Sequence, residues 1–202
     1  MNQPLKLSAI AVTASLLLAS QGALAYSAGD IFVRGGFAKT EVKSDNGSAD
    51  GQSLDIEDEN GFTYGAGYLF HDRIGVELNG SEPFEHDLTL ETAGSIGSVD
   101  RMPVNLLVNY YPLGGLDSRV QPYVGAGVNY TRFSDEPDGL DVDHSYGAVG
   151  QLGIDLAVTR NLMLNGFANY ADVDADIDSG GQQTGTAKVD PWTIGGGITL
   201  RF

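Results

Sequence analysis

The chain has 202 residues, no cysteine and a formal net charge of −16 at pH 7. Without cysteine there are no disulfides, so backbone pairing and apolar burial must hold the fold together. The acidic balance argues against nucleic acid as a partner, because phosphate binding requires basic patches.

The first 25 residues have the composition of a secretory signal peptide. Lys6 gives a positive start, residues 7–19 form a short apolar run, and residues 23–25 (ALA) form a small-x-small cleavage site. This order is typical of exported proteins. We therefore expect residues 1–25 to be removed and residues 26–202 to form one domain. No later apolar run reaches the length of about 20 residues that a transmembrane helix needs.

Alternation of apolar and polar residues with a period of two dominates the rest of the chain and predicts β-strands. No segment shows the sustained period of about 3.6 residues that an amphipathic helix would show. Most of the alternating segments reach the ~9–11 residues that a tilted strand needs to cross a bilayer. We predict eight strands, at residues 30–42, 60–70, 73–82, 98–112, 119–133, 143–158, 161–177 and 186–202.

The connections between these strands alternate between short and long. Short turns are predicted at residues 70–73, 112–118 and 159–160. Longer connections, which are polar and mostly acidic, are predicted at residues 43–59, 83–97, 134–142 and 178–185. Outer-membrane barrels have short periplasmic turns, longer outer loops and an even number of strands. The sequence therefore predicts an all-β fold: an eight-stranded antiparallel up-and-down transmembrane β-barrel with short periplasmic turns and longer extracellular loops.

One face of each strand is apolar, and its aromatic residues fall near the strand ends, where membrane interfaces favour them. The final residue, Phe202, continues this face, and we expect it to be the recognition signal for the barrel-assembly machinery. We expect lipid and lipopolysaccharide to cover the outer surface. A secreted lipocalin-like barrel or sandwich would also alternate, with its apolar face inward. The aromatic placement and the loop lengths favour the membrane barrel.

Several sequence blocks resemble the OmpW family of outer-membrane proteins. The most specific is RVQPYVGAGVNYT at residues 119–131. The others are GDIFVR at 29–34, DRIGVEL at 72–78 followed by PF at 83–84, YADVD at 170–174, VDPW at 189–192 and the final RF. The resemblance implies a barrel in the Gram-negative outer membrane, with a narrow and largely apolar interior that takes up or exports small hydrophobic molecules. The alternative is a non-transporting surface receptor, adhesin or structural outer-membrane protein.

The strand positions opposite the apolar face should line the interior, because side chains alternate between the two faces of a strand. An eight-stranded barrel is filled by its own side chains or holds one small ligand. Interior glycines such as Gly36 and Gly125 are expected to leave room for such a ligand. The residues predicted to line the lumen are Phe32, Arg34, Glu77, Asn79, Leu107, Asn109, Gln151, Asp155, Phe167, Asn169 and Val173.

Three of these residues, Arg34, Glu77 and Asp155, carry charge. They form either a polar lining or proton path, or a buried ion-pair network that plugs the barrel near its periplasmic end. We favour the plug, because buried charges persist only when they are paired. Asn79 and Asn169 align with positions where family members can carry bulky apolar constriction residues. These two amides should make the middle of the lumen more polar than a purely hydrophobic conduit.

The sequence does not predict an enzyme. His144 and Ser145 are the only adjacent histidine–serine pair. Neighbouring residues of a strand point to opposite faces, so these two do not easily form a nucleophile–base pair. The GxSxG and HExxH motifs and clusters of histidine and cysteine are also missing. We expect no catalytic residues and no cofactor.

Residues 170–178 read YADVDADID, with aspartate at every second position from Asp172. The stretch does not fit an EF-hand loop, because other residues occupy the positions of the required glycine and glutamate. Strand phase places Asp172, Asp174 and Asp176 on the lipid-facing side, so the hydrocarbon core must end near Tyr170. We expect a solvated strand end, with weak divalent-cation bridging of these aspartates to lipopolysaccharide phosphates as the alternative. No other metal site is expected.

Overall fold

The computed structural model describes most of the chain after residue 24. The described residues are 25–41, 47–49, 52–56, 59–90, 94–134, 140–142, 144–172, 174–179, 182–188 and 191–202. Side chains are described in residues 25–41, 59–83, 101–132, 144–172 and 191–202. In this part of the chain, no helix is long and apolar enough to cross a membrane.

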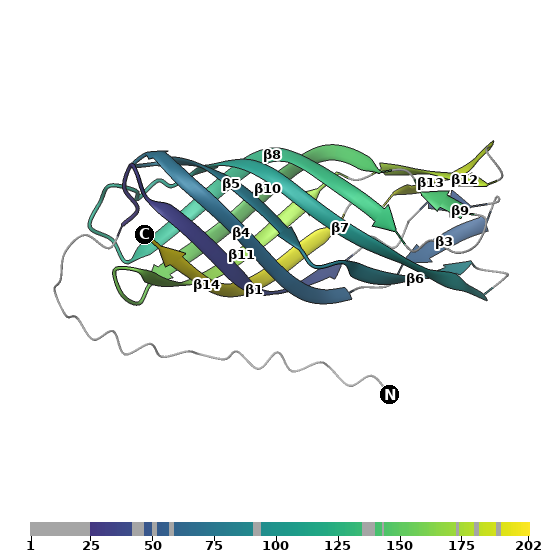
Figure 1. The fold of residues 1–202 in the computed structure, drawn as a ribbon, viewed down its shortest axis with the longest axis horizontal. Coiled ribbons are helices and arrows are strands. Elements are labelled where there is room, and N and C mark those ends of the chain that lie inside the picture. Colours follow the sequence, from purple (N-terminus) through teal and green to yellow (C-terminus); the bar gives the residue numbers. More distant parts are fainter. Residues whose placement is uncertain are drawn as a thin grey trace, which may run out of the picture.

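Long antiparallel strands close into a barrel (Figure 1). They are β1 (Ile31–Glu41), β4 (Glu59–His71), β5 (Ile74–Ser81), β7 (Gly94–Tyr110), β8 (Val120–Ser134), β10 (Ser145–Ala157), β11 (Leu162–Ala171) and β14 (Trp192–Arg201). The order around the ring is β5, β4, β1, β14, β11, β10, β8 and β7, and pairing of β5 with β7 closes it. The predicted eight-stranded antiparallel barrel is therefore confirmed.

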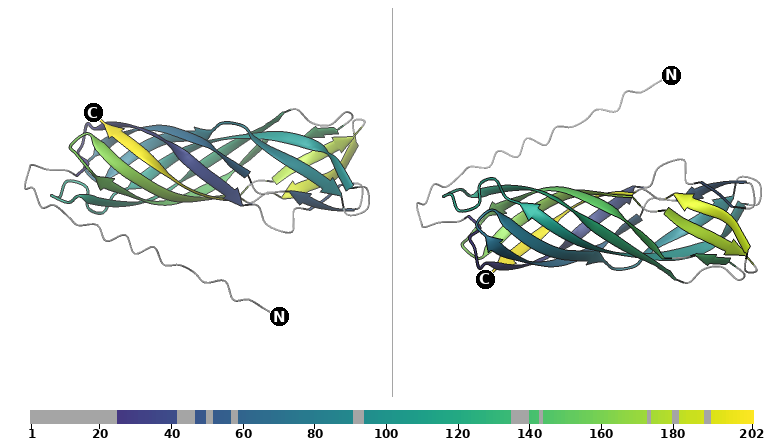
Figure 2. Two further views of the ribbon diagram at one scale, coloured as in Figure 1. Left: turned by 90° about the horizontal axis from the view of Figure 1, so that it is seen from below. Right: turned by 90° about the horizontal axis from the view of Figure 1, so that it is seen from above.

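The two ends of this barrel differ. The C-terminus and the short turns at residues 72–73, 111–119 and 158–161 lie at one end (Figure 1). Shorter strands extend the wall at the other end (Figure 2). They are β2 (Gly47–Ala49), β3 (Gln52–Ile56), β6 (Phe84–Leu90), β9 (Leu140–Val142), β12 (Asp174–Ser179) and β13 (Gln182–Lys188).

These shorter strands lie largely in segments that the sequence predicts as loops. The pairing of β2 with β3, for example, places Ser48 opposite Ser53 and Ala49 opposite Gln52. Ladder hydrogen bonds join backbone groups, so pairing can continue where apolar alternation has faded. Two predicted boundaries also move: β11 ends at Ala171, and β14 begins only after Pro191, which cannot donate to a ladder.

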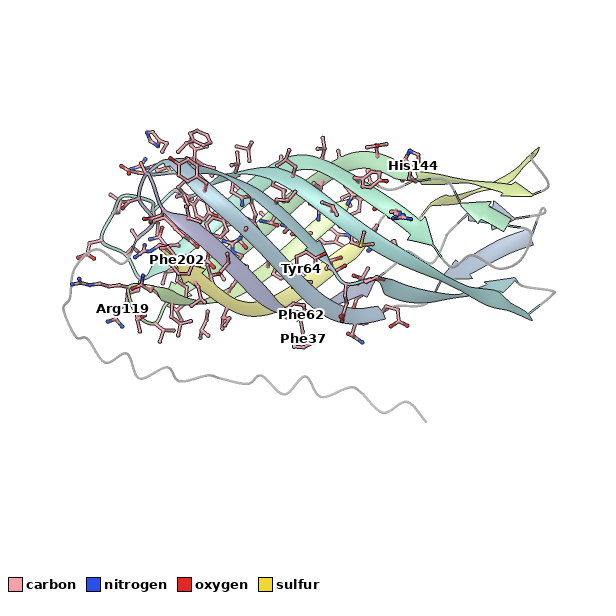
Figure 3. All side chains as sticks on the ribbon, viewed as in Figure 1. Phe37, Phe62, Tyr64, Arg119, His144 and Phe202 are labelled. Atoms are coloured by element: carbon pink, nitrogen blue, oxygen red, sulfur yellow. The ribbon has the colours of Figure 1, made fainter. Side chains whose placement is uncertain are left out.

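The outer surface of the barrel is apolar, as expected of a wall that faces lipid. On β10, for example, Leu152 and Ile154 are exposed while Gln151 and Asp155 are buried. Aromatic rings pair on this surface toward the end opposite the C-terminus: Phe37 with Phe62, Tyr130 with Tyr146, and Tyr170 with Trp192. Figure 3 shows Phe37 and Phe62 at the outer edge of the barrel. These pairs correspond to an interfacial aromatic girdle.

Several glycines give room to large side chains inside the barrel. A Cβ atom added to Gly67 would lie 2.2 Å from the Phe32 ring, and one added to Gly153 would lie 2.2 Å from the Tyr123 ring. At Gly125 the space is taken by the amide of Asn109. The expectation that Gly125 leaves room for a ligand is therefore wrong, because a protein side chain fills that room. Gly36, in contrast, borders an interior cavity.

Two alanine substitutions on β10 test this packing. Gly153→Ala should lower the free energy of unfolding by about 1–3 kcal/mol, because the new methyl group overlaps the Tyr123 ring. Gly150→Ala is the matched control, since an added Cβ there meets no atom within 4 Å. It should change stability by less than about 0.5 kcal/mol. Urea unfolding in lipid vesicles measures both. Equal stability of the two variants would contradict the packing described here.

Candidate functional site

A buried ion-pair network occupies the interior near the end that carries the C-terminus. Arg34 Nη1 lies 2.7 Å from Glu77 Oε2, and Arg34 Nη2 lies 2.7 Å from Asp155 Oδ2. The three side chains are 8%, 3% and 0% exposed, respectively. This is the pairing that the sequence interpretation favours over an open polar lining or proton path.

Aromatic residues surround the guanidinium of Arg34. It lies over the rings of Phe32 and Tyr123, at 4.5 and 4.6 Å from their centroids. The Tyr26 hydroxyl donates to Asp155 Oδ2 at 2.9 Å, and Arg34 Nη2 donates to the Tyr111 hydroxyl at 3.3 Å. Burial raises the pKa of the Tyr26 and Tyr111 hydroxyls, although Arg34 acts in the opposite direction. Both tyrosines therefore stay neutral at physiological pH.

Neutral donors complete the coordination of the two carboxylates. Asp155 Oδ1 accepts hydrogen bonds from Thr199 Oγ1 at 3.1 Å and from Asn165 Nδ2 at 2.9 Å. Glu77 Oε2 accepts hydrogen bonds from Asn109 Nδ2 and from Gln151 Nε2. Buried carboxylates are costly unless such partners are present. We call this set of Arg34, Glu77, Asp155 and the residues that contact them the plug.

A chain of amide side chains leads from the plug toward the opposite end of the barrel. The Thr131 hydroxyl donates to Asn129 Oδ1, and Asn129 Nδ2 donates to Asn105 Oδ1, both at 2.7 Å. Asn105 Nδ2 then donates to Asn79 Oδ1 at 2.9 Å. Asn79 Nδ2 donates to Glu77 Oε1 at 3.2 Å and to Gln151 Oε1 at 3.1 Å. We call Thr131, Asn129, Asn105 and Asn79 the amide chain.

Strand alternation places Asn105 and Asn129 on the inward faces of their strands, and the structure confirms this, but it does not predict that they form a connected site. Thr131, two residues after Asn129, continues the same inward face. Their mutual hydrogen bonds depend on strand register, in which Asn105 lies opposite both Asn79 and Asn129. Register between distant strands is not readable from a single alternating pattern.

Next to the plug, on the side away from the C-terminal end of the barrel, lies an interior cavity with a volume of about 60 Å³. We refer to positions on this side of the plug as above it. Every barrel strand contributes to its lining. Of the residues predicted to line the lumen, six border this cavity: Arg34, Glu77, Asn79, Gln151, Phe167 and Asn169. Four others, Phe32, Leu107, Asn109 and Asp155, are buried but do not border it. Val173 lies outside the described residues.

The remaining candidate residues do not form a site in the described structure. His144 is exposed and Ser145 is buried, so they point to opposite faces of the wall. The described residues contain no group of three histidine, cysteine or acidic side chains placed to hold a metal ion. Asp172 is exposed, but the side chains of Asp174 and Asp176 lie outside the described part of the chain. Cation bridging by these aspartates stays a prediction.

Comparison with known proteins identifies the family to which this barrel belongs. The model of the OmpW family matches residues 21–202. The chain belongs to the OmpW family. It is 33% identical to outer membrane protein W of Escherichia coli (strain K12), over 98% of this chain and 99% of that protein. It is also 33% identical to the dibenzothiophene metabolism operon protein PahQ of Pseudomonas aeruginosa, over 54% of each chain.

A solved structure of a similar outer-membrane protein agrees with the fold. The crystal structure of OprG from Pseudomonas aeruginosa superposes with a TM-score of 0.80 and 30% sequence identity, covering 90% of this chain and 99% of OprG. These relatives are outer-membrane barrel proteins rather than enzymes. The protein is therefore an outer-membrane β-barrel, as the sequence predicts.

Loss of the central cation should destabilise the plug. Arg34→Ala leaves Glu77 and Asp155 buried without a counter-charge, a loss that typically costs about 3–5 kcal/mol. Urea unfolding in lipid vesicles measures this change. Lys39→Ala serves as the control on the same strand: Lys39 pairs with Glu41 at the surface, where both side chains are about half exposed. The control should cost less than about 1 kcal/mol. An Arg34→Ala barrel as stable as the parent would contradict the role assigned to the ion pairs.

Proposed function

We propose that this OmpW-family barrel passes small hydrophobic molecules across the outer membrane. The observation that carries the proposal is the interior cavity, to which all the barrel strands contribute. Eight-stranded barrels are otherwise filled by their own side chains. A cavity inside such a narrow barrel is therefore a place where a small solute can reside.

Parts of the cavity wall are rich in carbon. Phe167, Val149, Ala171 and Pro103 border it, and so do several glycines that present no polar side chain. Sites for small molecules are usually concave and mostly apolar, with a few polar groups. The name of the relative PahQ links that protein to dibenzothiophene metabolism, and dibenzothiophene is an apolar aromatic compound. These observations support an apolar cargo for this chain.

The plug opposes straight passage along the barrel axis, because breaking a buried ion pair costs about 3–5 kcal/mol. The wall offers a weaker point beside the cavity. Pairing of β5 with β7 stops at Gly80, and pairing resumes with β6 at Phe84, so residues 81–83 and 102–103 lie outside these ladders. Ser81 and Pro103 in this interruption also border the cavity. We therefore place the exit of the solute at this interruption, above the plug.

Cavity size favours the second candidate function, a non-transporting surface receptor, adhesin or structural protein. The cavity measures about 60 Å³, whereas sites for drug-sized ligands span about 300–1,000 Å³. In this reading the plugged barrel is a rigid anchor for the strands that extend beyond the membrane. A flux measurement distinguishes the two functions.

We also propose partners for the outer surface of the barrel. The exposed apolar side chains support contact with lipid and with lipopolysaccharide. Phe202 is 70% exposed, and its backbone N–H donates to the Ile31 carbonyl at the edge of the barrel. This exposed position supports recognition of Phe202 by the barrel-assembly machinery.

Uptake into vesicles tests the transport proposal. Vesicles with an outer leaflet of lipopolysaccharide and the folded protein should take up naphthalene several-fold faster than protein-free vesicles. Ala171→Trp, which fills the cavity from β11, should abolish the difference. Ala148→Trp is the matched control, because Ala148 lies on the exposed face of β10. Uptake no faster than in protein-free vesicles would support the non-transporting function instead.

A plug variant tests the route. Met163 is fully buried in the apolar cluster that includes Tyr26, Phe32 and Tyr111. Met163→Ala shortens this side chain and loosens the plug without removing a charge. If the solute leaves through the wall, naphthalene uptake should be unchanged. Faster uptake by this variant would show that the solute passes through the plug.

A further inference from the structure

Two neutral side chains at the cavity carry a buried polar atom that has no hydrogen-bond partner among the described residues. The atoms are Ser81 Oγ and Asn169 Oδ1. Ser81 is 2% exposed and Asn169 is 9% exposed, and both residues border the cavity. Leaving a buried donor or acceptor unsatisfied costs about 1–3 kcal/mol. Such an arrangement therefore indicates that something else supplies the missing partners.

The neighbouring amides show that the barrel can satisfy its own polar groups. In the amide chain, the Oδ1 atoms of Asn79, Asn105 and Asn129 each accept a hydrogen bond from the next residue. Asn169 is excluded from this chain. Its nearest polar neighbour on β14 is Thr193, whose hydroxyl is hydrogen-bonded to Thr40 at 3.0 Å. On the other side, Gln151 of β10 lies opposite Asn169, but its amide donates to Glu77 and Asn109. No described side chain donates to the Asn169 carbonyl oxygen.

The two atoms lie on opposite sides of the barrel. Ser81 is on β5 and Asn169 is on β11, and three strands separate β5 from β11 in either direction around the ring. The cavity therefore lies between them. Phe167 and Val149 border the same cavity and provide carbon surface. Arg34, at the floor, is already paired with two carboxylates. Arg101, the other buried guanidinium that borders the cavity, also has an interaction within the protein, so neither arginine calls for a charged ligand.

We propose that the cavity binds small uncharged molecules that carry an O–H or N–H donor on an apolar body. The donor hydrogen-bonds to Asn169 Oδ1, which as a carbonyl oxygen only accepts, and the apolar body lies against Phe167 and Val149. Ser81, which can donate or accept, bonds to a second polar group where the molecule has one. This inference rests on the proposed transport function and adds to it a preference, among small apolar molecules, for alcohols, phenols and amides over hydrocarbons.

Benzyl alcohol and toluene form a suitable pair of probes, since they share a ring and differ in one hydroxyl group. We expect benzyl alcohol to shift the side-chain amide resonance of Asn169 saturably, in NMR spectra of the folded ¹⁵N-labelled barrel in lipid nanodiscs. Toluene at the same concentration should leave that resonance in place. Spectra of Asn169→Leu identify the resonance by its absence.

Variants measure the contribution of the hydrogen bond. Asn169→Leu should weaken benzyl alcohol binding about fivefold, as expected for the loss of one hydrogen bond of ~1 kcal/mol. Because this variant lacks the Asn169 resonance, its binding is read from the shift of the side-chain amide of Gln151, which also borders the cavity. Asn60→Leu is the matched control, because Asn60 is exposed at the end of β4, and it should leave binding unchanged. Ser81→Ala provides a second variant that keeps the Asn169 resonance, should Asn169→Leu fail to fold. Binding of a two-headed probe, 1,4-benzenedimethanol, should fall about fivefold in Ser81→Ala.

Two results would overturn the inference. Equal binding of toluene and benzyl alcohol would show that the site does not select for a donor. No shift with benzyl alcohol would show that water alone satisfies Asn169, for which a cavity of about 60 Å³ has room. Failure of transport is recognisable separately: benzyl alcohol would then bind at Asn169 while vesicle uptake stayed at the protein-free rate.

Discussion

The pairing of Arg34 with Glu77 and Asp155 is the interaction on which the interior of this barrel depends. A guanidinium inside a membrane-spanning protein is tolerated only with full compensation, and here each of its nitrogens has a partner. Glu77 in turn fixes the ends of Asn79, Asn109 and Gln151. The ion pairs therefore close one end of the barrel and also orient the polar groups that lie above them.

The bilayer explains why so many polar groups gather inside. In a soluble protein the apolar face of a strand packs inward, but in this barrel the same face contacts lipid. The inward face is left with asparagine, glutamine and threonine, several of which are hydrogen-bonded to one another. Glycine opposite Phe32 and Tyr123 lets large rings share this narrow space. The positions of the glycines on the strands therefore explain both features: close packing of large rings near the plug and an open cavity beyond it.

The alternating pattern was sufficient to predict the barrel and the direction of each strand's side chains. It placed Leu106 outward and Leu107 inward, for example, and the two are 53% and 1% exposed. It could not predict which inward residues meet, because Arg34 contacts partners 43 and 121 residues away through strand register and tilt. Nor could it predict strands such as β2 and β9, which have three residues each and are too short to carry an apolar pattern.

The contrast between satisfied and unsatisfied amides bears directly on function. A barrel that served only as an anchor would be more stable if every buried polar group were hydrogen-bonded to a neighbour, as Asn105 and Asn129 are. Asn169 lies at the same cavity, but its carbonyl oxygen accepts no hydrogen bond from the described residues. Proteins retain costly local arrangements mainly where function uses them. The unsatisfied carbonyl oxygen of Asn169 therefore argues that the cavity takes part in what this barrel does, whereas the plug closes one end of the barrel.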